Sequence, residues 1–274
     1  MKIHSLNTES SFNNSNLCLA IGNFDGLHKG HLKIINKLKE ISSKNNLHST
    51  VMSFNPHPRI FFNQITDPFN IYTHEDKLKF LKDLGLDSFI EFSFNNNLSK
   101  LSADEFIIEI LINKLQIKYL IIGEDFKFGN DRKGDFKTLN KYVLKKNFKI
   151  HLINPVMLND KTDKHSSSII RTHISNGNME EVRDALGRPW HMRGTVIEGD
   201  RRARQINFPT ANIIPGKHIL PKKGVYCVEV VFEDKKYKGV ANFGLRPTVN
   251  GNNLLLETHM FNFNKEIYGK ELTV

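Results

Sequence analysis

Cysteine is scarce in this chain, with two residues, Cys18 and Cys227, among 274. Disulfide frameworks and cysteine-ligated zinc sites need several cysteines at defined spacings, so both are excluded as the basis of the fold. Each cysteine lies in an apolar segment typical of a β-strand, and free cysteine is among the residue types most often buried. We therefore expect two buried free thiols.

The chain also lacks any apolar run long enough to cross a membrane. A membrane-spanning helix needs about 20 predominantly apolar residues in succession. The segment from Met1 to Asn16 is polar and has no apolar stretch of the kind that a signal peptide contains. We expect a cytoplasmic protein with no membrane partner.

Negative charge is in deficit, because 29 Asp and Glu residues face 39 Lys and Arg residues, which gives a net charge of +10. The lysines are scattered, apart from short runs such as Lys145-Lys146 and Lys222-Lys223, so the pattern does not favour a dedicated nucleic-acid surface. Polyanionic small molecules explain part of the charge, and we expect no nucleic-acid partner. The 39% hydrophobic and 25% charged residues are typical of a globular protein.

The first part of the chain predicts alternating strands and helices. Apolar runs bounded by turn residues predict strands, and apolar residues at every third or fourth position predict helices. Strands that alternate with helices favour βαβ units and a mostly parallel sheet. Two short helices are expected to end near Gly177 and Gly187, because glycine commonly terminates a helix. The expected strands are 17–21, 49–54, 89–94, 119–122 and 148–153, and the expected longer helices follow residue 31, span 73–84 and begin with a capping box at 102–105.

After Trp190 the helical periodicity gives way to short apolar segments separated by Gly, Pro or Asn. The segments 194–197, 225–232, 237–242 and 254–260 are typical of strands. Such spacing favours a small antiparallel barrel or a sandwich, so the predicted fold class is α/β followed by all-β. We place the boundary near Gly187, which gives predicted domains over residues 1–187 and 188–274.

The stretch Gly22-Asn23-Phe24-Asp25-Gly26-Leu27-His28-Lys29-Gly30-His31 joins a predicted strand to a predicted helix. Such a turn directs unpaired backbone N–H groups and the positive end of the helix at its occupant, which favours phosphate. Its glycines let the backbone turn sharply and approach a ligand closely. His28 and His31 are three residues apart, so both can donate to the oxygens of one phosphate ligand. The alternative is an ordinary strand–helix turn with two solvated histidines.

This segment resembles the H-x-G-H signature of the nucleotidyltransferase superfamily. In its G-x-F-D-G-x-H-x-G-H form it is similar to the N-terminal half of bacterial bifunctional riboflavin kinase/FAD synthetases. The resemblance implies a Rossmann-like parallel sheet followed by a small antiparallel β-barrel. It also implies ATP-dependent phosphorylation of riboflavin to FMN, and adenylylation of FMN to FAD with release of pyrophosphate. ATP and Mg²⁺ are the implied cofactors, and riboflavin, FMN and FAD are the implied substrates and products.

By this resemblance, the glycine-rich turn binds ATP for adenylyl transfer. His28 and His31 are assigned to the ATP phosphates as catalytic residues, because their N–H groups stabilise charge that builds on phosphorus. Asp25 orders the turn, or it holds a ligand or Mg²⁺. The further ATP-binding residues expected in this half are Gly22, Phe24, Gly30 and Gly123.

The segment Ser166-Ser167-Ser168-Ile169-Ile170-Arg171 opens a predicted helix and is similar to the S-S-(S/T)-x-I-R element of the family. Hydroxyls at a helix start and an arginine one turn on provide a second phosphate site, whereas the alternative is an ordinary helix cap. Because the H-x-G-H turn is also present, we expect Ser167 and Ser168 to bind ATP. Arg171 is expected to act on the departing pyrophosphate.

Two loops of the first part match flavin-binding segments of the family. Phe54-Asn55-Pro56-His57-Pro58-Arg59 is a proline-rich exit from a strand, where an aromatic ring and an arginine suit a flat ring system beside a phosphate. Gly123-Glu124-Asp125-Phe126-Lys127-Phe128-Gly129 follows another predicted strand, and ligands of open α/β sheets bind at strand ends. The expected flavin-binding residues are Phe54, Pro56, His57, Pro58, Arg59, Phe62, Asn63, Asp125 and Phe128.

The second part contains the string Pro209-Thr210-Ala211-Asn212 and, further on, Leu256-Glu257-Thr258-His259, which are similar to riboflavin kinase elements. The resemblance implies that Thr210 and Asn212 are Mg²⁺ ligands and that Asn212 also binds ATP. It implies that Glu257 is the general base for the ribityl hydroxyl. Members of the family continue beyond the position of Val274, so we expect a kinase domain that lacks its C-terminal end.

Two other functions remain open. One is another nucleotidyltransferase with an H-x-G-H turn, such as a cytidylyltransferase, in which the P-T-A-N and Glu257 segments have no role. The other is a non-catalytic protein that binds flavin, nucleotide or RNA, for which RNA affinity would depend on salt without ATP turnover. The oligomeric state is also open, including a homo-oligomer.

Overall fold

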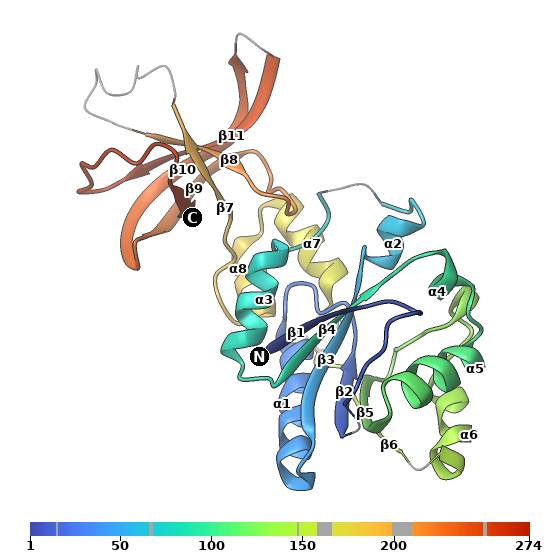
Figure 1. The fold of residues 1–274 in the computed structure, drawn as a ribbon. Coiled ribbons are helices and arrows are strands. Elements are labelled where there is room, and N and C mark those ends of the chain that lie inside the picture. Colours follow the sequence, from blue (N-terminus) through green and yellow to red (C-terminus); the bar gives the residue numbers. More distant parts are fainter. Residues whose placement is uncertain (15, 66–67, 147, 158–165, 199–209, 249–250) are drawn as a thin grey trace. The chain divides into compact units, whose positions relative to one another are not determined.

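The computed structural model describes residues 1–14, 16–65, 68–146, 148–157, 166–198, 210–248 and 251–274, apart from the side chains of 144–146, 246–248 and 251–253. The chain forms two compact units, whose elements are labelled in Figure 1. One unit comprises Met1–Thr66 and Glu75–Ser166, and the other comprises Asp67–His74 and Ser167–Val274.

A six-stranded sheet forms the centre of the first unit, with parallel pairing throughout and the strand order β1-β4-β3-β2-β5-β6 (Figure 1). The chain runs outward from β2 to β3 and β4 on one side, and then through β5 to β6 on the other. The direction in which the chain progresses across the sheet therefore reverses between β2 and β5, which is the switch point of the sheet. Ligands of such sheets bind outside the carboxyl ends of the strands at the switch point. The strands are Lys2–Leu6 (β1), Leu17–Ile21 (β2), His48–Asn55 (β3), Ser88–Ser93 (β4), Ile117–Gly123 (β5) and Lys149–Ile153 (β6).

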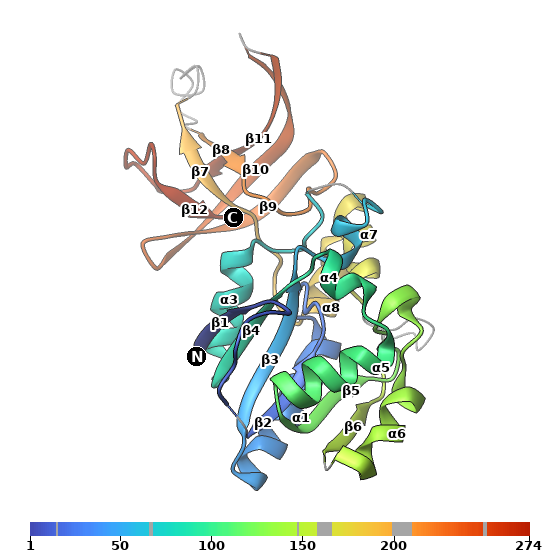
Figure 2. The same cartoon turned by 45° about the vertical axis from the view of Figure 1, so that its right-hand side comes forward.

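Helices cover both faces of this sheet (Figure 2). On one face, Ile35 and Leu38 of α1 and Leu81 of α3 are fully buried against the strands. The other face is covered by a segment that includes Phe106 and by Leu139 of α6. Because both faces are covered, all of β2 is buried, in agreement with its continuous apolar run. The helices are Lys29–Asn45 (α1), Pro58–Phe61 (α2), His74–Asp83 (α3), Asn96–Lys100 (α4), Ala103–Glu105 (α5) and Phe136–Lys146 (α6).

One predicted helix differs in form from the expectation. Ser102 and Glu105 make the predicted capping box at the start of α5. The helix then continues as a π-helix, Phe106–Lys114 (η1), after which the Leu115 N–H donates to the Ile110 carbonyl oxygen at 2.9 Å. Sequence periodicity does not distinguish this wider helix from an α-helix, because π-helices are rare and have no strong sequence signature. None of the helices that the structure describes combines the length and the apolar character that a bilayer crossing requires.

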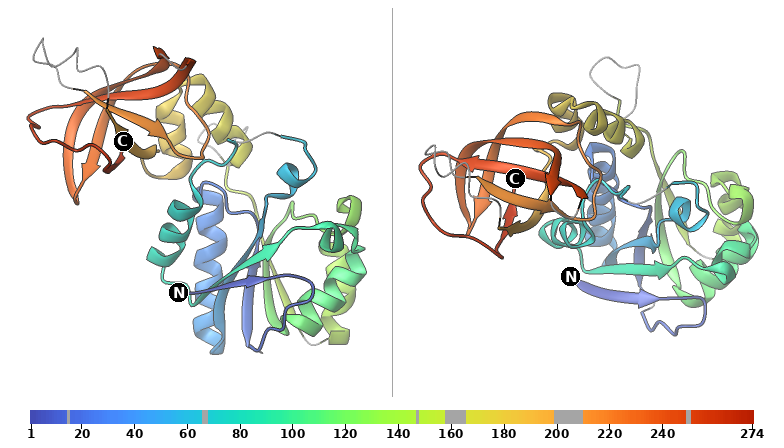
Figure 3. Two further views of the ribbon diagram at one scale, coloured as in Figure 1. Left: turned by 45° about the horizontal axis from the view of Figure 1, so that its top comes forward. Right: turned by 90° about the horizontal axis from the view of Figure 1, so that it is seen from above.

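The second unit is built on a closed barrel with the strand order β10-β11-β8-β7-β12-β9 (Figure 3). Neighbouring strands pair antiparallel, and Val230, Phe243 and Leu272 are among the residues buried in its core. Of the two architectures left open by the segment pattern, the barrel is confirmed. The strands are Arg193–Ile197 (β7), Ala211–Pro215 (β8), Gly224–Phe232 (β9), Lys235–Thr248 (β10), Gly251–Met260 (β11) and Glu271–Thr273 (β12).

Two helices, Ser167–Asn176 (α7) and Met179–Leu186 (α8), belong to the same unit as the barrel. Both end beside the glycines that predicted their ends. Gly187 takes the left-handed conformation with φ 74°, and its N–H donates to the Arg183 carbonyl oxygen. The domain boundary near Gly187 stays a prediction, and the two compact units meet in the sequence at Ser166 and Ser167.

A short segment from the first part of the sequence, Asp67–His74, completes the second unit. The Asn70 carbonyl oxygen accepts from the Ile219 N–H at 2.7 Å, and the Ile71 carbonyl oxygen accepts from Trp190 Nε1 at 2.8 Å. The second unit is therefore discontinuous in sequence.

The cysteines do not both meet the expectation of burial. Cys18 is fully buried in β2, and burial raises the pKa of its thiol to about 11. Cys227 is exposed on β9, so the prediction of a buried thiol is wrong there. Successive residues of a barrel strand alternate between the two faces, and Cys227 falls on the outer face together with Val225 and Glu229.

Candidate functional sites

The glycine-rich turn lies between the end of β2 and the start of α1, at the switch point of the sheet. His28 is the N-cap of α1, and its Nδ1 accepts a hydrogen bond from the His31 N–H at 3.4 Å. The two imidazole rings stack with centroids 3.7 Å apart and an interplanar angle of 22°. Both histidines therefore lie together at the positive end of a 17-residue helix, in an arrangement suited to a phosphate chain.

The other residues of this turn set its backbone. Gly26 has φ 83°, a conformation that glycine adopts at little cost, and the buried Phe24 has φ 49°. Gly22 provides space, since a Cβ there would lie 3.3 Å from the Phe24 ring. Gly30 lies in the first turn of α1, and Asp25 is buried with 7% exposure. Of the predicted glycines in the turn, Gly26 is the one that requires left-handed backbone.

Asn23, which the sequence reasoning did not single out, connects this turn to the proline-rich segment. Its Nδ2 lies 2.8 Å from His57 Nε2. His57 is also the N-cap of α2, where its Nδ1 accepts from the exposed Arg59 N–H at 3.1 Å. Pro58 and Arg59 thus begin a short helix, whereas the expectation was a rigid loop at this place. Proline suits the first helical position because it has no N–H to leave unpaired.

Four phenylalanines gather near the carboxyl ends of β3 and β4. The Phe94 ring centroid lies 5.8 Å from that of Phe54, 5.2 Å from Phe61 and 5.7 Å from Phe62, with edge-to-face geometry. Phe62 is 51% exposed and Asn63 beside it is also exposed, so a flat ring can reach this cluster. The sequence identified Phe54 and Phe62. It missed Phe61, which lies on α2, and Phe94, which joins the cluster because β3 and β4 are neighbours.

Gly123 is the last residue of β5, and the loop that follows it lies at the end of the strand that neighbours β2 on the other side from β3. Asp125 is exposed, and its Oδ1 lies 3.1 Å from the position of a Cβ on Gly123, so the glycine leaves room for this carboxylate. Phe128 is 7% exposed and packs in the core, with its ring 5.5 Å from the rings of Phe106 and Phe126. Most of the Phe128 surface is therefore covered by protein.

Ser167, Ser168 and Arg171 lie together near the start of α7, in the second unit. Arg171 Nε donates to the Phe69 carbonyl oxygen at 3.0 Å, and its guanidinium lies 3.5 Å from the centroid of the Phe69 ring. Stacking on an aromatic ring fixes the plane and direction of the guanidinium. The predicted serines and arginine are thus on one helix end, whereas the two histidines belong to the first unit.

Lys77, which the sequence reasoning did not single out, extends from α3 to β3 and β4. Its Nζ donates to Ser53 Oγ on β3 at 2.6 Å and lies 5.4 Å from the centroid of the Phe89 ring. Desolvation lowers the pKa of Lys77 to about 8, and the carboxylates of Asp25 and Glu91 partly offset this effect. A lysine in an amphipathic helix pattern indicates a solvated side chain, so no sequence signal revealed this one.

Glu257 lies in the middle of a polar row that crosses three barrel strands. β11 pairs with β8 so that Glu257 is opposite Asn212, and with β10 so that it is opposite Asn242. Directly opposed residues of antiparallel strands have Cβ atoms about 4.5–5.5 Å apart on the same face of the sheet. The barrel therefore brings Glu257 and the buried Asn212 together. Asn242 is a member of this row that the sequence reasoning missed.

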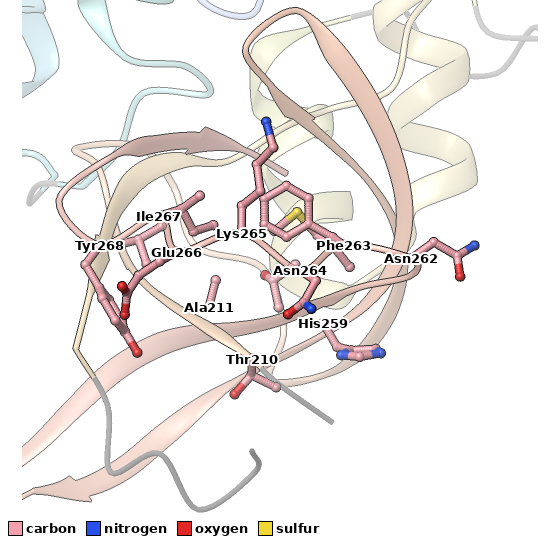
Figure 4. A pocket seen from close by; sticks show the side chains of 13 residues that line it. Thr210, Ala211, His259, Asn262, Phe263, Asn264, Lys265, Glu266, Ile267 and Tyr268 are labelled. Carbon is pink, nitrogen blue, oxygen red and sulfur yellow. The ribbon is translucent and has the colours of Figure 1, made fainter. Parts of the chain in front are cut away.

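Thr210 lines a pocket of about 750 Å³ within the second unit. Figure 4 shows its side chain among those that line the pocket, together with His259 from β11 and with Glu266 and Tyr268 from the connection between β11 and β12. Thr258 also lines the pocket, and its fully buried Oγ1 has no hydrogen-bond partner among the described residues. A buried hydroxyl of this kind favours a ligand with a polar group, because an unsatisfied buried polar atom is costly.

The oxygen atoms of Thr210 and Asn212 fit the preference of Mg²⁺ for oxygen ligands. Asn212 is the second residue of β8, and Thr210 directly precedes this strand. Magnesium that is bound with substrate phosphates usually keeps several waters and takes one or two protein ligands. Thr210 and Asn212 can supply these protein ligands. Pro209, the first residue of the P-T-A-N string, lies outside the described residues, as do residues 199–208.

Comparison with known families divides the chain into two matched regions. Residues 10–169 match the family model for FAD synthetase, and residues 186–274 match the one for riboflavin kinase. The bifunctional riboflavin kinase/FMN adenylyltransferase of Buchnera aphidicola subsp. Schizaphis graminum is 39% identical over 95% of this chain and 84% of its own length. The protein of the same name from Escherichia coli K12 is 36% identical over 93% of this chain and 82% of its own length.

A solved structure agrees over the full chain. The crystal structure of a macrolide-efflux protein from Streptococcus pneumoniae has a TM-score of 0.88 and 29% sequence identity, and the match covers 100% of this chain and 89% of that chain. The two family models account for most of the sequence, and the relatives align over most of both lengths. The chain therefore belongs to the family of bifunctional riboflavin kinase/FMN adenylyltransferases.

Proposed function

We propose that this chain phosphorylates riboflavin to FMN and transfers an adenylyl group from ATP to FMN, which gives FAD and pyrophosphate. The observation that carries the proposal is the stacked pair of His28 and His31 at the start of α1, at the switch point of a parallel sheet. The polar row of Glu257 and Asn212 in a separate barrel supports the kinase reaction.

In adenylyl transfer, an oxygen of the FMN phosphate attacks the α-phosphorus of ATP, and pyrophosphate leaves. No protein nucleophile is needed, so the enzyme acts by positioning the reactants and by stabilising charge on the phosphate oxygens. The N–H groups at the start of α1 and the imidazoles of His28 and His31 supply this stabilisation. We assign Ser167, Ser168 and Arg171 to the phosphates as well, with Arg171 on the departing pyrophosphate.

The flavin of this reaction is assigned to the exposed side of the phenylalanine cluster. Phe62 provides an open aromatic face there, and stacking on such a face suits the flat isoalloxazine ring. His57 is within hydrogen-bond distance of Asn23 in the ATP-binding turn, which supports a flavin phosphate placed near ATP. Arg59 and Asp125 are exposed near the strand ends and are assigned to the polar atoms of the flavin.

In the kinase reaction, we assign Glu257 as the general base. Its carboxylate accepts the proton of the ribityl 5′-hydroxyl while that oxygen attacks the γ-phosphorus of ATP, and ADP leaves. Thr210 and Asn212 would hold Mg²⁺, which neutralises charge on the ATP phosphates when it is bound. The register that places Asn212 opposite Glu257 supports a common site for these two residues. Thr210 lines a pocket with the volume of a small-molecule site, and the described residues that line it do not include Asn212 or Glu257.

Chromatographic separation of flavins after incubation with ATP and Mg²⁺ tests both reactions. We expect FAD from riboflavin and also from FMN. FAD from FMN alone would remove the kinase assignment and keep adenylyl transfer. No product from either flavin would contradict the proposal and favour a binding protein, whereas turnover with CTP in place of ATP would favour a cytidylyltransferase. Salt-dependent RNA affinity without ATP turnover would favour an RNA-binding role.

A further inference from the structure

Asn23 lies in the glycine-rich turn, and neither proposed reaction assigns it a step. It is two residues beyond the end of β2, and His57 is two residues beyond the end of β3, the neighbouring parallel strand. Parallel pairing therefore brings both residues to one edge of the sheet, where Asn23 Nδ2 lies 2.8 Å from His57 Nε2. The other polar atom of the Asn23 amide is buried and has no hydrogen-bond partner among the described residues, so His57 is the side chain that orients this amide.

The second contact of the His57 ring determines which of its nitrogens carries the proton. Its Nδ1 accepts a hydrogen bond from the Arg59 N–H at 3.1 Å, so Nδ1 is unprotonated. A neutral imidazole has one N–H, which is then on Nε2, and this N–H donates to Asn23. The acceptor that Asn23 offers is its amide oxygen. A half-turn of the amide exchanges Nδ2 and Oδ1 in the same place, because the two ends have the same shape, and presents the oxygen to His57.

His57 connects this contact to the aromatic surface that is assigned to the flavin. It is the N-cap of α2, and its carbonyl oxygen accepts from the N–H groups of Ile60 and Phe61 at 2.8 and 3.0 Å. Phe61 and the following Phe62 lie edge-to-face against Phe94, with ring centroids 5.2 and 5.7 Å apart from it. A helix of four residues depends on contacts outside itself, so the place of these two rings depends on how His57 is held.

We propose that Asn23 is a positioning residue for the flavin: its amide oxygen holds the His57 ring, and the His57 cap holds α2 so that the aromatic face suits the isoalloxazine ring. This inference rests on the proposed adenylyl transfer, and Asn23 acts through His57 without touching the flavin. A residue of the ATP-binding turn thus determines the affinity for the other substrate. A turn residue that served only the ATP phosphates would change the affinity for ATP instead.

Three single variants test this division. Asn23→Ala removes the acceptor, Asn23→Asp keeps an oxygen in the same place, and Asn36→Ala makes the matched exchange at an exposed position of α1. We expect Asn23→Ala to raise KM for FMN in FAD formation about fivefold or more and to keep KM for ATP within about twofold. Asn23→Asp should keep KM for FMN within about twofold and raise KM for ATP, because it adds negative charge to the phosphate-binding turn. Asn36→Ala should leave both constants unchanged.

A double-mutant cycle with His57→Asn distinguishes positioning through His57 from a merely structural role. Asparagine is also a good N-cap, and this exchange removes the Nε2–H. If Asn23 acts through His57, Asn23→Ala adds little to the KM for FMN in the His57→Asn background. A structural loss would raise KM by the same factor in both backgrounds. Urea unfolding of every variant is the folding control, and Asn23→Leu, which keeps the shape of the side chain, replaces Asn23→Ala if that variant does not fold.

Two results would overturn the inference: an unchanged KM for FMN in Asn23→Ala, or an equal rise with and without the His57 imidazole. An equal rise in Asn23→Ala and Asn23→Asp would overturn it as well, because the acceptor would then have no effect. Riboflavin phosphorylation by the same samples is an internal measure, since the proposed kinase residues Glu257 and Asn212 belong to the other unit.

Failure of the proposed function is separate and would show as no FAD from FMN with the unsubstituted chain. Titration of FMN fluorescence with each variant in the absence of ATP measures flavin affinity without turnover. We expect the dissociation constant for FMN to rise in Asn23→Ala and to stay unchanged in Asn36→Ala. An FMN affinity that is equal in these two variants and in the unsubstituted chain would overturn the role of Asn23, whether or not FAD is formed.

Discussion

His28 and Glu257 are the single residues on which the two proposed reactions depend most. The His28 ring stacks on His31 at the start of α1, and Glu257 lies between Asn212 and Asn242 in the barrel. The two residues belong to different compact units. Substitution of either one is therefore expected to affect one reaction and leave the other.

Replacement of His28 by alanine removes a donor to the ATP phosphates and the side-chain cap of α1. We expect FAD formation from FMN to fall by about a hundredfold or more, because charge stabilisation on phosphate oxygens is the main source of rate. Riboflavin phosphorylation should stay within about twofold of the unsubstituted chain. Initial rates of both reactions, measured on one preparation, check this, and a parallel loss of both in a folded variant would contradict it.

Replacement of Glu257 by glutamine keeps the size of the side chain and removes its ability to accept a proton. FMN formation from riboflavin should fall by about a hundredfold, in the range typical of a lost general base. FAD formation from added FMN should be unaffected. Asn242→Ala is the matched variant in the same polar row, and we expect a smaller loss from it. Unchanged phosphorylation in Glu257→Gln would exclude Glu257 as the base.

The two cysteines should differ in reactivity. Burial raises the pKa of the Cys18 thiol to about 11, so at pH 8 it is protonated as well as inaccessible, whereas Cys227 is exposed. We expect a thiol reagent at pH 8 to label one cysteine in the native protein and both in denaturant. Cys227→Ser should abolish the native labelling. Rapid labelling of Cys18 in that variant would show that β2 is less protected than its burial implies.

Individual site residues were predictable where a continuous string of sequence places them together. The string from Gly22 to His31 is one such case, because a strand, a turn and a helix follow directly on each other. Phe94, Asn242 and Lys77 were not predictable in this way. Each joins its site only through the pairing of strands or the packing of a helix that is distant in sequence.

At the scale of elements, the continuous apolar run of β2 predicted a buried central strand, and the structure confirms it. The first strand of the sheet, β1, was missed. It pairs only with β4 at the sheet edge and mixes exposed Lys2 and Ile3 with buried Leu6, so its pattern resembles a polar loop. β12 was missed because three residues are too few to show alternation. Short and edge strands owe their conformation to neighbours and not to their own sequence.

Barrel closure depends on close strand contact at Gly194 of β7. A Cβ at this position would lie 2.1 Å from the Ile214 carbonyl oxygen, so alanine must push β7 and β8 apart. We expect Gly194→Ala to lower the free energy of unfolding of this unit by about 1–3 kcal/mol. Trp190, the only tryptophan of the chain, belongs to this unit, so its fluorescence in urea reports the change.

Gly244→Ala in β10 is the matched control, because nothing lies within 4 Å of a Cβ there. Its urea midpoint should differ little from that of the unsubstituted chain. If the urea midpoint of Gly194→Ala equals that of Gly244→Ala and of the unsubstituted chain, then separating β7 from β8 does not lower the free energy of unfolding.

At the scale of the whole molecule, His28 and Glu257, the residues on which the two proposed reactions depend most, lie in separate compact units, and FMN is common to both reactions. A mixture of His28→Ala and Glu257→Gln chains should therefore convert riboflavin to FAD, with FMN passing through solution from one chain to the other. Neither variant alone should do so. Flavin chromatography over time checks this and should show FMN before FAD. A mixture that makes FMN but no FAD would indicate that FMN does not leave the chain that forms it.

The segment Asp67–His74 adds a constraint on the order in which this protein can fold. The ribosome makes the segment before residues 75–166, yet its carbonyl groups accept hydrogen bonds from Trp190 and Ile219, which are synthesised much later. Local elements therefore cannot satisfy these backbone groups as the chain emerges. The barrel unit can reach its described structure only after the ribosome has made Ile219, so the segment 67–74 must wait for its partners until the whole sheet unit has been translated.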